Sequence, residues 1–197
     1  MNPNNYKEYI RRAYDTACRN GFHDEEKSLN HFLMLAITEV AEMVEADRKG
    51  NHAIVMAFKI EISKPQKEEY RQIHWRALFD TYIKDSYEDE MADVCIRLFD
   101  LAGLMDWTPN YMYAAQYNEL YKDFQERYRK YSVAEKSYEL CKILASFREG
   151  KCQQICFDIP IAFLCCWAKS EGIDLEWHIN QKMEYNEHRA RLHGKRY

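Results

Sequence analysis

Glycine and proline are scarce in this 197-residue chain, with six and four residues respectively. An all-β sandwich or barrel needs many tight turns, which use these residues, so the composition argues against that class. No apolar run reaches the ~18–20 residues that a membrane helix needs. Residues 1–14 also lack the apolar segment of a secretory signal. We therefore expect a cytoplasmic protein that does not interact with a membrane.

Disulfide and metal-binding cysteine motifs are lacking as well. The seven cysteines contain no CxxC pair, and most lie in apolar helical stretches, which favours reduced thiols. Basic blocks are also missing: 28 Lys and Arg residues stand against 32 Asp and Glu residues, and the formal net charge is −4. Because nucleic-acid-binding proteins typically carry a basic face, we expect no nucleic acid among the partners.

What the sequence does contain is an apolar period close to 3.6 residues over almost its whole length. Segment 51–65 is less regular, because residues 58–62 alternate as a strand would, and we expect a loop or an irregular helix there. Hydrophobic residues make up 47% of the chain, enough for one sizeable core. We predict an all-α helical bundle that forms a single domain over residues 1–197. The period predicts helices over 6–20, 25–49 or 28–49, 66–84, 86–105, 110–131, 133–149, 152–170 and 174–193.

Two of the predicted helices each carry an acidic pair three residues apart. The pairs are Glu39 with Glu42, and Glu90 with Asp93. Residues at this spacing lie on one face of a helix, about one turn apart. At about 100° per residue, both pairs have the same offset from the apolar stripe of their helix. If the two stripes face each other in the bundle, the four carboxylates converge at the rim of the core.

Four converging carboxylates repel each other unless a cation lies among them. Oxygen ligands suit a hard divalent ion, so we predict a Mg²⁺ site, with Mn²⁺ possible. Solvated surface acids remain the alternative, whereas a di-iron site would need Glu-x-x-His motifs, which the sequence lacks. Asp100 continues the acidic flank and is a candidate for orienting a ligand or a bound water. The predicted metal ligands are Glu39, Glu42, Glu90 and Asp93.

The last predicted helix carries a narrow stripe of hydrogen-bond donors. Lys182, Asn186, Arg189 and His193 recur at i, i+4, i+7 and i+11. These side chains suit phosphate oxygens, although a solvated helix end would also explain them. A carboxylate–metal site beside a cationic stripe is what a polyphosphate ligand requires. The combination indicates a nucleoside triphosphate or a similar ligand.

Three segments taken in order resemble a known family. The ExxE pair, YEDEMADVCIRLFDLAG at 87–103 and KMEYNEHRARLHGK at 182–195 are similar to the MazG-like all-α nucleoside triphosphate pyrophosphohydrolases. The resemblance implies a bundle with additional helices around a four-helix core, Mg²⁺ dependence and cleavage of the α–β phosphate bond. The products would be a nucleoside monophosphate and pyrophosphate, and the role would be nucleotide-pool house-cleaning. It also implies a homodimer or a higher homo-oligomer, with Lys182, Asn186 and Arg189 on the substrate phosphates.

The resemblance further implies that water attacks phosphorus, with Glu39 or Glu42 positioning the water or accepting its proton. For the substrate base the sequence offers His31, near Glu42, together with the aromatic residues Trp75 and Trp107. Segment 51–84 makes the spacing between the acidic motifs longer than in compact family members, and would form a lid, a dimer contact or part of the base pocket. The alternative is a non-catalytic metal- and nucleotide-binding or protein-interaction module on the same fold.

Overall fold

A computed structural model describes residues 5–108, 116–147 and 157–190. These residues form helices and no strand, so the predicted all-α class is confirmed. No helix among them is long and apolar enough to cross a lipid bilayer. In chain order the helices are α1 (Tyr6–Arg19), α2 (Leu29–Arg48), α3 (Val55–Ile62), α4 (Glu68–Tyr82), α5 (Tyr87–Leu104), α7 (Tyr117–Tyr128), α8 (Val133–Ala145), α9 (Ile159–Glu171) and α10 (Leu175–Glu187).

Two predicted boundaries need correction. The strand-like alternation near Phe58 lies within a regular helix, α3. The last helix, α10, ends at Glu187 and not near His193, so Arg189 lies just beyond its end. The buried residues of α10 stop at Asn186, and a helix is stabilised mainly by packing of its apolar face. His193 and parts of the predicted helices 110–131, 133–149 and 152–170 lie outside the described residues.

The helices that carry the acidic and donor residues begin at side-chain caps. The Ser86 hydroxyl accepts a hydrogen bond from the Asp89 backbone N–H at the start of α5. The Asp174 carboxylate accepts one from the Trp177 N–H at the start of α10, at 3.1 Å. Such caps satisfy N–H groups that have no partner within the helix. The two caps fix where each helix starts.

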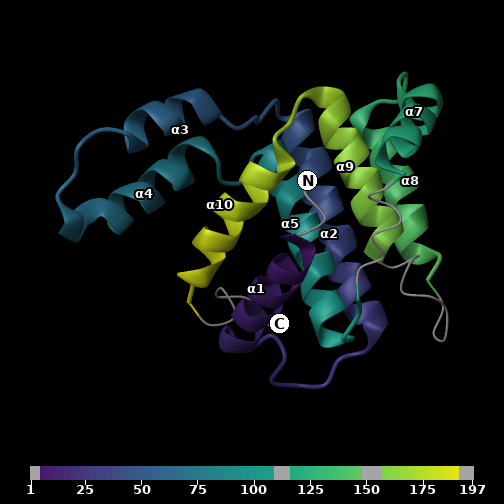
Figure 1. The fold of residues 1–197 in the computed structure, drawn as a ribbon, viewed down its shortest axis with the longest axis horizontal. Helices are drawn as coiled ribbons and strands as arrows, with labels where there is room; N and C mark the ends of the chain where they lie inside the picture. The colour runs from purple at the N-terminus through teal and green to yellow at the C-terminus, as the bar shows by residue number, and fades with distance from the viewer. Residues whose placement is uncertain (1–4, 109–115, 148–156, 191–197) are drawn as a thin grey trace.

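Helix α5 is the centre of the molecule, and α1, α2, α9 and α10 pack against it (Figure 1). Its inner side chains, such as Met91 and Leu98, are fully buried. Gly103 allows α1 to approach closely, because a Cβ atom at this position would lie 2.5 Å from the Cβ of Tyr14. The helices that surround α5 therefore bring distant parts of the chain to one helix face.

Helices α3 and α4 form a hairpin that extends away from the rest of the molecule (Figure 1). We call this hairpin, residues 54–83, the arm. A small second core joins it to α10, where the ring of Phe79 stacks on that of Tyr185 with centroids 4.6 Å apart. The predicted irregular segment is thus part of a helical extension. The arm exposes the large apolar side chains Ile54, Met56, Ile60, Tyr70 and Ile73.

Candidate functional site

A cavity of about 390 Å³ is lined by residues of α1, α2, α5 and α10 and of their flanking segments. Its volume is within the range of about 300–1,000 Å³ that is typical of small-molecule sites. The structure brings together all seven residues that the sequence assigned to metal and phosphate, although they come from three distant segments. They are Glu39, Glu42, Glu90, Asp93, Lys182, Asn186 and Arg189.

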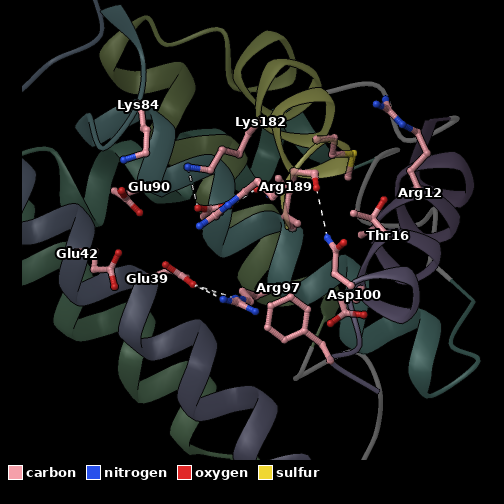
Figure 2. A pocket seen from close by; sticks show the side chains of 18 of the residues that line it. Arg12, Thr16, Glu39, Glu42, Lys84, Glu90, Arg97, Asp100, Lys182 and Arg189 are labelled. Carbon is pink, nitrogen blue, oxygen red and sulfur yellow. Dashed lines mark hydrogen bonds and ion pairs between the residues drawn. The ribbon is translucent and has the colours of Figure 1, made fainter. Parts of the chain in front are cut away.

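Three carboxylates form one end of the cavity. Glu39 and Glu42 come from α2, Glu90 comes from α5, and Figure 2 shows them on the same side of the cavity. Each offers an oxygen, and these three oxygens lie within 4.8 Å of one another. Glu39 and Glu90 are both 4% exposed, whereas Glu42 is open to solvent. We call these three residues the carboxylate group. Its oxygens are close enough to share one cation.

The carboxyl of Glu90 is the least compensated member of the carboxylate group. Its Oε2 atom is buried and has no hydrogen-bond partner among the described residues. Burial raises the pKa of Glu90 to about 9, and the neighbouring charge of Asp93 adds to this shift. A carboxyl in this state is stabilised by a positive charge. The ammonium group of Lys182 opposes the shift, but no described residue forms a hydrogen bond with Oε2.

Glu39 is held by an arginine that the sequence analysis missed. Arg97 Nε and Nη2 lie 2.9 and 2.8 Å from Glu39 Oε1. Burial raises the pKa of Glu39, Asp93 adds to the shift, and Arg97 opposes it. Arg97 stands four residues after Asp93 on α5, so helix periodicity places it on the same face. That spacing is the signal by which it could have been found.

Lys182 lies among acidic side chains rather than free in the cavity. Its Nζ is 2.9 Å from Asp93 Oδ2 and 2.5 Å from Asp89 Oδ2, and its side chain is 4% exposed. Burial alone would lower the pKa of Lys182, but Asp93, Asp89 and Glu90 raise it above its usual range. Asp93 is therefore compensated by an internal ammonium group. The role of Lys182 on phosphate stays a prediction.

Further cationic groups lie beside this pair. Lys84, which follows α4, contacts the carboxylate of Asp85 at 2.6 Å, and both residues line the cavity. The Asp85 backbone has a φ of 58°, a conformation that Asp adopts more readily than most residues. Arg189 Nη1 lies 3.5 Å from Asn186 Oδ1. Figure 2 shows Lys84, Lys182 and Arg189 across from Glu39 and Glu42.

The residues proposed for the substrate base lie elsewhere among the described residues. His31 packs edge-on against Phe32, Trp107 packs on the main core and Trp75 belongs to the small core of the arm. The described lining of the cavity includes none of the three. The cavity is lined further by Arg12, Ala13, Thr16, Ala17, Asn20, Phe22, Ile96, Asp100 and Met183, and Figure 2 shows Thr16 and Asp100 on the side away from the carboxylate group. The sequence analysis considered only Asp100 of these, because no motif marks the others.

No family model, curated protein or solved structure matches this chain. The similarity to the MazG-like family therefore rests on the sequence motifs, and the chemistry of the site rests on its own geometry.

Proposed function

We propose that this protein is a Mg²⁺-dependent nucleoside triphosphate pyrophosphohydrolase of the MazG-like type. The observation that carries the proposal is the composition of one cavity. It combines the carboxylate group with the cationic side chains of Lys84, Lys182 and Arg189. A polyphosphate substrate needs both, because its charge is shared between a metal ion and cationic side chains. Cleavage of the α–β bond and a house-cleaning role follow from the resemblance in the motifs.

The residues present fit a magnesium ion. Glu39, Glu42 and Glu90 offer oxygen atoms only, which is the donor type that Mg²⁺ prefers. The Oε2 atom of Glu90 is buried and has no hydrogen-bond partner among the described residues, so it could coordinate a metal ion. Asp93 stands beside this group as the fourth predicted ligand. When bound, the ion would lower the pKa of a coordinated water and neutralise phosphate charge.

The side chains of the chain itself then divide into two roles. Arg97 fixes the Glu39 carboxylate through Oε1, whereas Glu42 is exposed to solvent. We assign the uptake of the proton of the attacking water to Glu42, with Glu39 orienting that water. Lys182, Asn186 and Arg189 would donate to phosphate oxygens.

Pyrophosphate release tests this proposal directly. Canonical and modified nucleoside and deoxynucleoside triphosphates are incubated with Mg²⁺ or with chelator. We expect monophosphate and pyrophosphate only with Mg²⁺, and a loss of at least about a hundredfold in Asp93→Asn. Glu45→Gln is the matched control, because Glu45 lies on α2 in surface ion pairs with Arg48 and Lys49. Release of orthophosphate alone, or no release from any nucleotide, would contradict the proposal.

The arm favours a second candidate function. Its exposed apolar side chains suit a protein partner, as in a non-catalytic metal- and nucleotide-binding or protein-interaction module. The same surface would also serve the homodimer or higher homo-oligomer that the resemblance implies. Mg²⁺-dependent thermal stabilisation without turnover would favour the non-catalytic module. Light scattering of the purified chain would give its oligomeric state.

A further inference from the structure

The cavity continues along α5 beyond the carboxylate group. Glu90, Asp93, Arg97 and Asp100 follow one another at helical spacing on one face. At a rise of 1.5 Å per residue, Glu90 and Asp100 are about 15 Å apart along the helix. Figure 2 shows Asp100 on the far side of Arg97 from Glu42 and Glu90. A nucleotide whose phosphates lie at the carboxylate group would therefore extend its base toward Asp100.

The far end of the cavity has the shape and polarity that a flat base needs. Ala13 and Ala17 present small side chains from α1, and Phe22 and Met183 add apolar surface. The ring of Phe22 lies 5.8 Å from the guanidinium of Arg97. Aromatic rings and guanidinium groups both stack on nucleobases without regard to base identity. These contacts would hold a base but would not tell one base from another.

Asp100 adds the selective contact at this end. The residue is 6% exposed, and its Oδ1 lies 2.7 Å from Nε2 of His23. The ring of His23 lies between Tyr14 and Phe32, with centroids 5.2 and 5.3 Å away. Asp100 is therefore held in one orientation by a side chain that is itself packed. An ionised carboxylate accepts hydrogen bonds and donates none.

We propose that Asp100 reads the substrate base and selects a base with an exocyclic amino group on its pairing edge, as in cytosine and adenine. This inference rests on the proposed function, because it takes the carboxylate group as the phosphate end. The amino group would donate to Asp100, whereas the oxo group of uracil or hypoxanthine would present a lone pair to the carboxylate. A site built to pair one polar group rejects the analogue that lacks it. His23 is a positioning residue for Asp100.

Matched nucleotide pairs test the proposal. The ratio of kcat/KM is measured for CTP against UTP and for ATP against ITP. We expect the wild-type protein to prefer the amino member of at least one pair by about tenfold or more, the ratio for one buried hydrogen bond. Asp100→Asn, whose amide both donates and accepts, would bring that ratio close to one or reverse it. Asp123→Asn, on the exposed face of α7, is the matched control and should leave it unchanged.

The role of His23 has a separate readout. His23→Phe keeps an aromatic ring next to Tyr14 and Phe32 but removes the ring nitrogen that is hydrogen-bonded to Asp100. We expect His23→Phe to reduce the base preference several-fold through KM, with little change in kcat. His23→Gln can donate a hydrogen bond to Asp100 and should restore part of the preference. Thermal melting shows which variants fold. If Asp100→Asn does not fold, the wild-type ratios decide the proposal alone.

Binding measurements separate this proposal from the proposed reaction. The dissociation constants of CMP, UMP, AMP and IMP are determined by calorimetry with Mg²⁺ present. Tighter binding of an amino member, lost in Asp100→Asn, would support the base assignment even if no triphosphate were hydrolysed. Hydrolysis with equal ratios in both pairs would overturn the base assignment and leave the reaction standing. Neither binding nor hydrolysis of any nucleotide would overturn both.

Discussion

Two glutamates in the structure differ in the burial and the hydrogen bonding of their carboxyl groups. Glu171, at the end of α9, accepts hydrogen bonds from Tyr87 Oη, Lys136 Nζ and Trp167 Nε1, each at 2.7 Å. Glu90 is more deeply buried, with 4% exposure against 26% for the side chain of Glu171. Its Oε2 nevertheless has no partner among the described residues. The carboxyl of Glu90 is buried more deeply than that of Glu171, yet one of its oxygens lacks a hydrogen bond that would offset the burial.

The difference between the two glutamates distinguishes a carboxylate with a structural role from one in a binding site. A charged group with several hydrogen bonds ties helices together, as the exposed Glu171 ties α5, α8 and α9. A buried carboxyl that lacks a partner and faces a cavity destabilises the protein by itself. Glu90 is placed against Glu39 and Asp93, which add to its cost. Such an arrangement is expected where a cation binds, because binding supplies the compensation that folding omits.

The largest expected effect concerns Glu90→Gln. We expect Mg²⁺-dependent pyrophosphate release to fall by at least about a hundredfold, because the change removes a metal ligand. The free energy of unfolding without metal should stay the same or increase, since a repelled carboxyl is lost. Urea denaturation and the release assay are run on the same samples. A variant that keeps its activity would mean that Glu90 is not a ligand.

Magnesium itself should stabilise the folded protein. A ligand that binds only the folded state adds about 2.7 kcal/mol at a concentration of 100 times its Kd. Thermal melts over a Mg²⁺ titration at constant ionic strength would show a rising Tm for the wild type and for Tyr87→Phe. The rise should be absent in Glu90→Gln. An equal rise in all three proteins would point to a cation site outside the carboxylate group.

The substitution Tyr87→Phe tests the role of Glu171, whose carboxylate accepts hydrogen bonds from three side chains. It removes the hydroxyl that donates to Glu171 Oε2 while keeping the buried ring. We expect a loss of about 2 kcal/mol in the free energy of unfolding, the value for a hydrogen bond to a charged group. The kcat below the unfolding transition should not change. A loss of activity without a loss of stability would reverse the roles that we assign to the two glutamates.

Much of this organisation is already present in the sequence. The matched offsets of Glu39 with Glu42 and of Glu90 with Asp93 predicted that two helices present acids to one space, and they line one cavity. Periodicity carries this information because each pair has a fixed angle to its own apolar stripe. Capping at Ser86 depends on local sequence for a similar reason, since the Ser86 hydroxyl and the Asp89 N–H that donates to it are three residues apart.

Contacts between distant segments could not be predicted in this way. Lys182 pairs with Asp89 and Asp93, and His23 pairs with Asp100. Each of these pairs depends on how α1 and α10 are rotated against α5, which helix periodicity does not specify. Small residues such as Ala13 become important only because α1 borders the cavity. The sequence analysis therefore named conspicuous aromatic residues for a substrate base, whereas the described lining of the cavity consists of other residues.

The smallest expected effect concerns His178, a second buried group with an atom that lacks a hydrogen-bond partner among the described residues. His178 on α10 is 3% exposed, and its Nδ1 has no hydrogen-bond partner among the described residues. Burial lowers the pKa of His178 to about 4 from an ordinary value of 6.5. The folded protein thus keeps this ring neutral while the unfolded chain takes up a proton below pH 6.5, so stability falls as the pH decreases toward 4.

We expect the His178 contribution to lower the free energy of unfolding by about 1–2 kcal/mol between pH 6.5 and pH 5. His178→Gln should flatten the pH dependence in that window and should leave both pyrophosphate release at pH 7.5 and the Mg²⁺-dependent rise in Tm unchanged. Denaturation curves at several pH values give the slope. A variant that kept the full slope would move the acid sensitivity to another group. A His178→Gln variant that lost the Mg²⁺-dependent rise in Tm would show that His178 contributes to the metal site. Glu90 would then not differ from His178 in its effect on metal binding.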